Sequence, residues 1–209
     1  MLKQEPILKK SMKIICHGDS LTEGVDIEKA YSWTSLVEHN LRVSVVNHGI
    51  GGNTTAGMLS RFSYEVAQQQ PAIVILMGGT NDLWWDLELN LIQANLSAMV
   101  SQAKYHGIAP VIGLPLPIWI EKAKAQEWAP PAKGYAYLAA QINKLAEVLK
   151  ATAKQWEVPV LDFHHLFLNN QGTVKTSLFL DDGVHASKKG HRVMGVCGAD
   201  LIKEVFHFA

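Results

Sequence analysis

The sequence contains few cysteines, no long apolar segment and no excess of charge of either sign. Its two cysteines, Cys16 and Cys197, lie far apart among apolar neighbours, which favours buried thiols in a reducing compartment over a disulfide framework. No apolar run reaches the roughly 18 residues that a membrane-spanning helix needs. Nineteen Lys and Arg residues balance nineteen Asp and Glu residues without forming a basic stripe, so we expect neither nucleic acid nor an anionic membrane surface as the main partner.

The sequence also lacks internal repeats, low-complexity tracts and flexible linkers. Its 209 residues, 48% of them hydrophobic and 18% charged, fit one globular domain that spans residues 1–209. Residues 1–11 are polar and lysine-containing, without the apolar core of a secretory signal. We therefore expect a poorly ordered N-terminal extension and a cytoplasmic protein, although a signal peptide that had already been removed would leave no trace.

Short runs rich in Val and Ile alternate along the chain with longer segments of helical periodicity. The apolar runs predict strands at 12–16, 43–47, 72–77, 109–113 and 158–162. The periodic segments predict helices at 31–41, 54–69, 87–106, 132–156 and 187–206. Strands that alternate with helices form right-handed βαβ units, so the sequence predicts an α/β fold in which a five-stranded parallel sheet lies between two layers of helices.

Polar, glycine-rich segments follow the first three predicted strands, at 17–24, 48–54 and 78–82, and another at 181–185 precedes the last helix. Each segment alone is typical of ordinary turns and helix caps. Ligands of parallel α/β sheets bind beyond the carboxyl ends of the strands. We therefore expect these four segments to meet at one site.

The residues in these segments suit acyl transfer through a serine. The hydroxyl of Ser20 is a weak nucleophile and needs an adjacent base. His185, with Asp182 three residues before it, supplies a base and a carboxylate to orient it. The backbone N–H groups of Ser20 and Gly52 and the amide of Asn81 are suitable donors to a developing oxyanion. The set predicts a serine hydrolase that cleaves esters or thioesters.

On these residues the chain resembles the SGNH (GDSL) hydrolase family of esterases, lipases, thioesterases and carbohydrate deacetylases. The matching blocks occur in order: Gly18-Asp19-Ser20-Leu21, Gly52, Gly79-Thr80-Asn81-Asp82 and Asp182-Gly183-Val184-His185. Ala186 stands where the family usually has proline, a departure that touches no proposed chemical group. The resemblance implies a flavodoxin-like three-layer fold and an acyl-enzyme intermediate, with no metal and no cofactor. It also implies the roles of nucleophile for Ser20, base for His185, orienting carboxylate for Asp182, and oxyanion donors for Ser20, Gly52 and Asn81.

Other interpretations of the same sequence are weaker. A carbohydrate O-deacetylase with the same triad is the main alternative, and a non-catalytic carbohydrate- or lipid-binding module on the same fold is another. The run Gly49-x-Gly51 lacks the third glycine of a dinucleotide site, where Thr54 stands. The chain has no Gly-x-Ser-x-Gly motif, and the spacing of its nine histidines matches no recognised set of metal ligands.

Several charged residues near these segments have less certain roles. Asp181 is a rival for the triad carboxylate, although the three-residue spacing favours its neighbour. Asp19 is expected to accept hydrogen bonds from loop amides, and Arg61 could pair with that carboxylate. For His17 and His48 we favour a packed or hydrogen-bonded structural role over contact with substrate.

The substrate is expected to be a small-molecule ester or thioester with a short or medium acyl chain. Trp84, Trp85 and Trp119 follow predicted strands and are candidates for its pocket, whereas Trp128 and Trp156 are assigned to packing. The irregular, proline-containing connection 113–134 is long for a compact domain, which predicts a pocket wall or partial lid.

Overall fold

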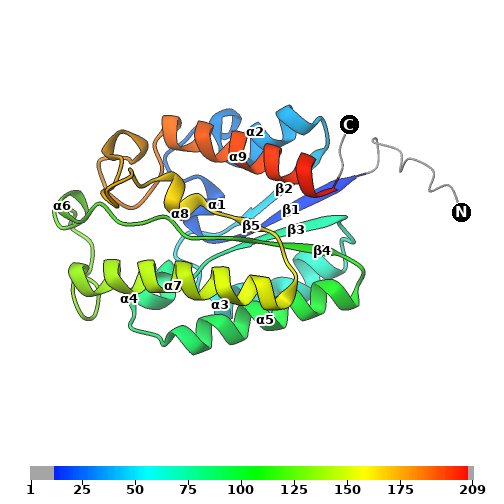
Figure 1. The fold of residues 1–209 in the computed structure, drawn as a ribbon, viewed down its shortest axis with the longest axis horizontal. Coiled ribbons are helices and arrows are strands. Elements are labelled where there is room, and N and C mark those ends of the chain that lie inside the picture. The colour runs from blue at the N-terminus through cyan, green and yellow to red at the C-terminus, as the bar shows by residue number, and fades with distance from the viewer. Residues whose placement is uncertain (1–11, 207–209) are drawn as a thin grey trace, which may run out of the picture.

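A parallel sheet of five strands forms the centre of the molecule, which we describe from a computed structural model over residues 12–206 (Figure 1). The strands are β1 (Lys13–Gly18), β2 (Ser44–Gly49), β3 (Ile73–Met77), β4 (Ala109–Gly113) and β5 (Val160–Leu161). Their order is β2-β1-β3-β4-β5, and every neighbouring pair is parallel. The predicted α/β fold is confirmed, with strand ends shifted by one or two residues. The expected extension at residues 1–11 lies outside the described residues.

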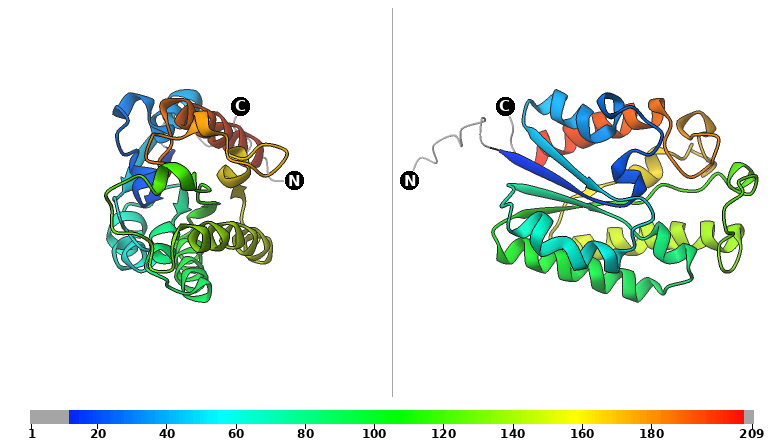
Figure 2. Two further views of the ribbon diagram at one scale, coloured as in Figure 1. Left: turned by 90° about the vertical axis from the view of Figure 1, so that its left-hand side faces the viewer. Right: turned by 180° about the vertical axis from the view of Figure 1, so that it is seen from behind.

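Helices cover both faces of the sheet, as the two further views show (Figure 2). The helices α2 (Trp33–Leu41) and α9 (Lys188–Phe206) form one layer, and α3 (Thr55–Phe62), α5 (Leu89–Tyr105) and α7 (Tyr135–Trp156) form the other. The predicted helix at 54–69 ends earlier in α3 and continues as a π-helical turn at Ser63–Ala67. Sequence periodicity did not reveal the short helices α1 (Ser20–Glu23), α4 (Thr80–Trp84), α6 (Ile120–Ala123) and α8 (Phe163–Leu166), nor the 3-10 turns Lys29–Tyr31 and Thr176–Leu178.

The strand β3 shows why the sheet is buried on both faces. All five of its residues are buried, and alternate side chains point to opposite sides. Val74 and Leu76 pack against the α3–α5–α7 layer, whereas Ile75 and Met77 pack against the α2–α9 layer. Burying each such side chain stabilises the fold by roughly 1.5–3 kcal/mol. This central strand therefore ties the two hydrophobic cores together.

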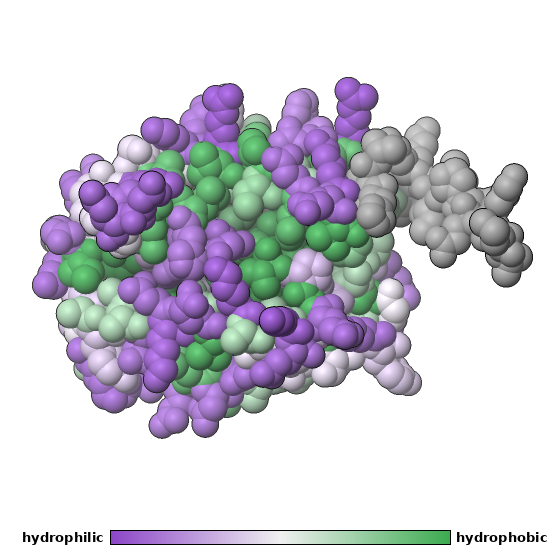
Figure 3. Space-filling model, in the orientation of Figure 1, coloured by the Kyte–Doolittle hydropathy of each residue, from purple (hydrophilic) through white to green (hydrophobic). Residues whose placement is uncertain are grey.

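The surface hydropathy and the state of the two cysteines were compared with the expected location of the protein. On the face shown in Figure 3, hydrophobic residues reach the surface between α9 and α7, and hydrophilic residues cover much of the helices. Among residues 12–206, no helix combines the length and the apolar character needed to cross a membrane. Cys16 is buried and Cys197 half-buried, and both are free thiols. The cytoplasmic location stays a prediction.

The buried side chain of His191 connects three helices on one face of the sheet. Its Nδ1 accepts a hydrogen bond from the backbone N–H of Trp33, the first residue of α2, with 3.0 Å between the nitrogens. The indole Nε1 of Trp33 donates in turn to the carbonyl oxygen of Leu21 in α1, at 3.0 Å. Burial, with the charge of nearby His185 as a smaller cause, lowers the pKa of His191 from 6.5 to about 4. The ring is therefore held neutral as an acceptor.

Acid is expected to destabilise the protein through His191. Between pH 6.5 and 4 the unfolded chain binds a proton that the folded chain does not, so the stability due to the neutral ring is complete above pH 6.5 and is lost as the pH falls toward 4. The substitution His191→Asn keeps an acceptor close to Nδ1 but cannot titrate. Between pH 7 and pH 5 we expect the unfolding free energy of wild type, measured with urea, to fall by about 2 kcal/mol more than that of His191→Asn. A difference that stays constant over this range would contradict the role of His191.

Candidate active site

The serine follows the first strand directly. After β1 ends at Gly18, Asp19 caps the short helix α1 by accepting the backbone N–H of Leu21 at its Oδ1, at 2.9 Å. Ser20 is thus the first residue of α1, where N–H groups have no acceptor within the helix. Burial raises the pKa of the fully buried Asp19 to about 7, although the hydrogen bond from Leu21 opposes this shift. The predicted use of Asp19 as an acceptor for loop amides is confirmed by this contact.

His185 and Asp182 lie on a tight turn that reaches Ser20. The Nε2 of His185 lies 2.9 Å from Oγ of Ser20, and its Nδ1 lies 2.7 Å from Oδ2 of Asp182. The remaining carboxylate oxygen accepts the backbone N–H groups of Val184 and His185 at 2.8 and 2.9 Å. The turn depends on Gly183, whose φ of 71° lies in the left-handed region that favours glycine. Because a carboxylate can only accept, Nδ1 carries the imidazole proton and Nε2 can accept the hydroxyl proton of Ser20.

The neighbouring aspartates Asp181 and Asp182 have different surroundings. The side chain of Asp182 is 12% exposed, whereas that of Asp181 is 93% exposed and forms an ion pair with Lys122 at 3.0 Å. Burial tends to raise the pKa of Asp182, but the hydrogen bonds from His185 and from the turn amides outweigh burial and hold this pKa below its usual value. The carboxylate beside the imidazole is therefore the ionised Asp182, and Asp181 faces solvent.

Two further loops bring N–H donors to the same place. Gly52, in the loop after β2, has a φ of 73°, and the N–H of Asn53 donates to the carbonyl oxygen of Ile50 at 3.1 Å across this turn. Asn81 lies in the first turn of α4, and its Nδ2 donates to the carbonyl oxygen of Asn53 at 3.0 Å. A side-chain amide carries two N–H groups, so this contact leaves a second one for a substrate.

Asp82, the neighbour of Asn81, fastens the same loop to the start of α3. Its fully buried carboxylate accepts the backbone N–H of Thr55 at 2.9 and 3.2 Å and the Thr55 hydroxyl at 2.6 Å. Burial raises the pKa of Asp82, and the hydrogen bonds from Thr55 offset part of that rise. Adjacent residues of α4 thus hold Asn53 and Thr55, which fixes the loop that carries Gly52.

A cavity of about 440 Å³ opens beside these groups. Four of its lining residues carry the proposed chemistry: Ser20, Gly52, Asn81 and His185. Most of the others are apolar and include Leu21, Val25, Trp84, Trp85, Trp128 and Val184. The cavity therefore combines a few polar groups with a largely apolar lining, as typical small-molecule sites do.

Trp84 anchors the aromatic wall of the cavity. Its ring contacts those of Trp128 and Tyr135 edge to face, with centroids 6.2 and 5.8 Å apart, and its Nε1 donates to the carbonyl oxygen of Ala129 at 3.0 Å. The Trp128 ring also meets the imidazole of His185, at a centroid distance of 6.1 Å. The irregular segment 113–134 thus supplies part of the pocket wall, as predicted.

Two predictions about the tryptophans need correction. Trp84 and Trp85 line the cavity, but Trp119 lies outside it, packed against the α2–α9 core, and its backbone N–H donates to the carbonyl oxygen of Gly183 at 2.8 Å. Trp128, for which the sequence predicts a packing role, lines the cavity instead. Both residues lie in the irregular connection 113–134, which has no periodic pattern to indicate which way its side chains face, so the positions of the two rings depend on tertiary contacts.

Three residues near the site do not line its cavity: His17, His48 and Arg61. His17 is fully buried with its Nε2 2.9 Å from a backbone carbonyl oxygen of α3, and the half-buried His48 contacts a glutamine amide. The structural roles expected of both histidines are confirmed by these contacts. Arg61 forms its ion pair with Glu65 and not with Asp19, because Glu65 lies one turn further along the same helical segment.

The parallel sheet with the Ser20–His185–Asp182 arrangement at its carboxyl edge is the framework of a serine ester hydrolase. Residues 16–193 match the model of the GDSL-like Lipase/Acylhydrolase family, and the chain belongs to this family. The predicted resemblance and the predicted class of enzyme are thereby confirmed.

Individual known proteins resemble the chain over most of its length. An arylesterase from Vibrio mimicus is 29% identical over 180 residues, which cover 84% of this chain and 80% of the relative. An acetylxylan esterase from Geobacillus stearothermophilus is 26% identical over 164 residues, which cover 74% of this chain and 69% of the relative. The crystal structure of a member of the lipolytic protein G-D-S-L family from Veillonella parvula DSM 2008 has a TM-score of 0.74 and 25% identity, and the match covers 95% of this chain and all of that one.

The different surroundings of Asp181 and Asp182 lead to a paired prediction. Asp182→Asn should lower kcat for p-nitrophenyl acetate about 10⁴-fold, because an amide at this position no longer fixes the tautomer of His185 or stabilises its protonated form. Asp181→Asn, the matched control one residue away, should stay within about twofold of wild type, since exposed groups outside a site contribute little. Equal losses at the two positions would contradict the assignment of the carboxylate.

Proposed function

We propose that the protein hydrolyses carboxylic esters and thioesters through an acyl-enzyme formed on Ser20. The observation that carries this proposal is the continuous hydrogen-bonded chain from Oγ of Ser20 through His185 to Asp182, of which Ser20 and His185 line the cavity of about 440 Å³. A hydroxyl within 2.9 Å of an unprotonated imidazole nitrogen is arranged for proton transfer as it attacks.

The reaction has two steps. Oγ of Ser20 attacks the acyl carbon while its proton passes to Nε2 of His185, and the resulting tetrahedral intermediate collapses when that proton moves to the leaving alcohol or thiol. A water molecule then attacks the acyl-enzyme, gives its proton to His185, and releases the carboxylic acid as Ser20 regains its proton. Asp182 stays ionised and stabilises the imidazolium in both steps.

The oxyanion of each tetrahedral intermediate is stabilised by N–H donors from three loops. In this proposal they are the backbone N–H groups of Ser20 and Gly52 and the second N–H of Asn81. All three residues line the cavity, and their loops are fixed by buried hydrogen bonds before substrate arrives. Donors that need no reorganisation stabilise developing charge most effectively.

The central test uses p-nitrophenyl acetate and a serine-directed fluorophosphonate. Wild type should hydrolyse the ester and become labelled on Ser20, whereas Ser20→Ala should lose roughly four to six orders of magnitude in kcat and take up no label. Circular dichroism confirms that both proteins are folded. An inert wild type, or an active and labelled Ser20→Ala, would overturn the proposal.

A carbohydrate O-deacetylase is the second candidate, and the aromatic rim of the cavity favours considering it. Trp85 and Trp128 are 60% and 42% exposed beside the site, and exposed aromatic rings can stack on the faces of sugars as well as on acyl chains. Comparing kcat/KM for acetylated xylo-oligosaccharides, acyl-thioesters and p-nitrophenyl esters of two to ten carbons decides between the candidates. A sugar acetate preferred at least about tenfold over the simple esters would favour the deacetylase.

Trp128 is expected to contribute to substrate binding. Trp128→Ala removes a ring that faces both Trp84 and His185. It should lower kcat/KM for aryl esters about two- to tenfold, mainly through KM, because an aromatic contact contributes roughly 0.5–1.5 kcal/mol. Trp156→Phe, at the far end of α7, is the control and should leave kcat/KM unchanged. Equal kcat/KM values for Trp128→Ala and wild type would contradict a role of Trp128 in substrate binding.

A further inference from the structure

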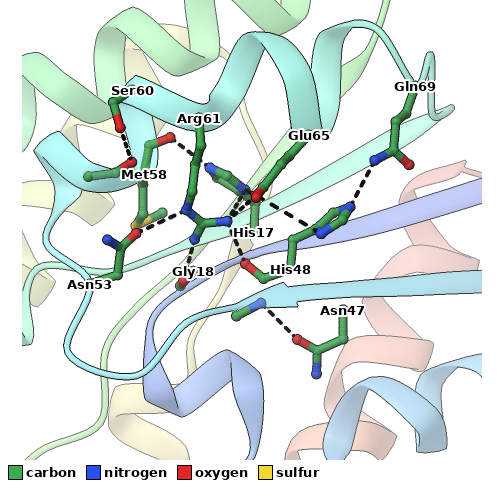
Figure 4. Close-up of polar contacts among 12 residues, drawn as sticks. His17, Gly18, Asn47, His48, Asn53, Met58, Ser60, Arg61, Glu65 and Gln69 are labelled. Atoms are coloured by element: carbon green, nitrogen blue, oxygen red, sulfur yellow. Dashed lines mark hydrogen bonds and ion pairs between the residues drawn. The ribbon is translucent and has the colours of Figure 1, made fainter.

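The side chain of Arg61 lies at the junction of two loops that form the proposed site (Figure 4). It is 14% exposed and projects from α3 into a cluster of backbone carbonyls. Its Nη2 donates to the carbonyl oxygen of Gly18 at 2.8 Å, its Nη1 to that of His48 at 2.9 Å, and its Nε to Oδ1 of Asn53 at 3.1 Å. Glu65 completes the set as an ion-pair partner. One guanidinium thus contacts the ends of β1 and β2 and the loop beyond β2.

The contact with Gly18 bears on the nucleophile. The carbonyl of Gly18 belongs to the peptide group that leads into Asp19 and Ser20, so its orientation sets the entry of the chain into α1. This oxygen accepts a second hydrogen bond from the backbone N–H of Ile50 at 3.1 Å. Arg61 therefore holds the turn that carries Ser20 against the loop that carries Gly52.

The contact with Asn53 bears on the oxyanion donors. The side chain of Asn53 is held by Arg61, while its backbone carbonyl accepts Nδ2 of Asn81 at 3.0 Å. Gly52 precedes Asn53 directly, so the same residue borders one backbone donor and anchors the amide donor. Movement of Asn53 would displace both donors together.

The surroundings of Arg61 suit a fixed guanidinium. The Nε2 of His17 is bonded to the carbonyl oxygen of Met58, which leaves the Nδ1 of His17 to accept from Nη1 of Arg61 at 3.3 Å. Burial and the positive charge of Arg61 lower the pKa of His17 from 6.5 to about 3, so this histidine is neutral and adds no repulsion. The planar fork of arginine matches this spread of acceptors, and the single ammonium of lysine cannot reach all of them.

We propose that Arg61 is a positioning residue that holds the Ser20 turn and the Asn53–Asn81 oxyanion loop at the separation that the reaction needs. The proposal rests on the proposed ester hydrolysis. Arg61 acts through the carbonyl of Gly18 and the side chain of Asn53, and it does not belong to the residues that line the cavity. Its contribution therefore falls on the rate of the chemical steps and not on the binding of substrate.

The test measures kcat per active site, with sites counted by fluorophosphonate labelling carried to completion. Removing one oxyanion donor outright costs about 10²–10³ in kcat, so displacing the donors with Arg61→Met should cost about 10- to 100-fold, with KM within about threefold of wild type. The kcat per site of Arg61→Lys should lie between the values of wild type and Arg61→Met. Arg192→Met, which removes an exposed arginine from α9, is the matched control and should match wild type.

A purely structural role would give a different result. In that case Arg61→Met would lower the melting temperature and the number of titratable sites, but each remaining site would turn over at the wild-type rate, and the proposal would be overturned. If Arg61→Met fails to fold, Arg61→Lys and Asn53→Ala carry the same test, because Asn53→Ala removes the acceptor of Nε and leaves the helix intact. Both are expected to lower kcat per site at least about fivefold, and wild-type rates in both would overturn the proposal.

A double-mutant cycle tests the route through the oxyanion loop. In an Asn81→Ala background one of the displaced donors is already absent, so Arg61→Met should cost several-fold less in kcat than it does in wild type. If Arg61→Met lowered kcat by the same factor in both backgrounds, the two effects would be independent and this route would be overturned. An inert wild type would overturn the proposed function and this inference with it, whereas an active wild type with normal Arg61 variants would overturn the inference alone.

Discussion

Parallel strands end at the same edge of a sheet, and this constraint brings most of the site together. The loops after β1, β2 and β3 must leave the sheet side by side, because β1 lies between β2 and β3. Ser20, Gly52 and Asn81 are thereby brought together, although about thirty residues separate each from the next along the chain. The proposed base, His185, comes from the opposite end of the sequence, and it reaches Ser20 because α9 packs in the layer beside α2, where His191 bonds to Trp33. The sheet and its helices bring these residues close together, and the loops only have to orient their side chains and N–H groups.

Orientation comes from carboxylates that are buried beside the site. Asp19 is fully buried to cap α1, and Asp82 is fully buried to hold Thr55 at the start of α3. Taking a carboxylate out of water is costly unless it receives hydrogen bonds, and burial raises the pKa of both groups. The folded state tolerates that cost because each group fixes a loop that no strand or long helix could fix. Rigid loops of this kind keep donors aligned without reorganisation during the reaction.

The sequence was sufficient to predict the features that depend on local pattern. The sequence predicts the five strands, the five longer helices and the carboxylate-to-histidine spacing at Asp182 and His185, because each is a short-range signal with a physical cause. It does not predict the roles of Trp119 and Trp128, since both lie in an irregular connection where no periodicity indicates which side chain faces the cavity. The pairing of Arg61 with Glu65 is a different case, because the two residues stand four apart within the predicted helix 54–69, and this spacing alone indicates an ion pair.

In the proposed reaction the amide of Asn81 has two tasks, one in holding a loop and one in binding the oxyanion. A hydroxyl at this position would have a single O–H to share, and a carboxylate would have none, but an amide has two N–H groups in one rigid plane. One of them is bonded to the carbonyl oxygen of Asn53, which fixes the plane and so aims the other. The bond to Asn53 is useful only if Asn53 itself does not move, and its side chain is held by Arg61, which also holds Gly18. The direction of a donor in the cavity is thus set by a cation outside it, through two intervening hydrogen bonds.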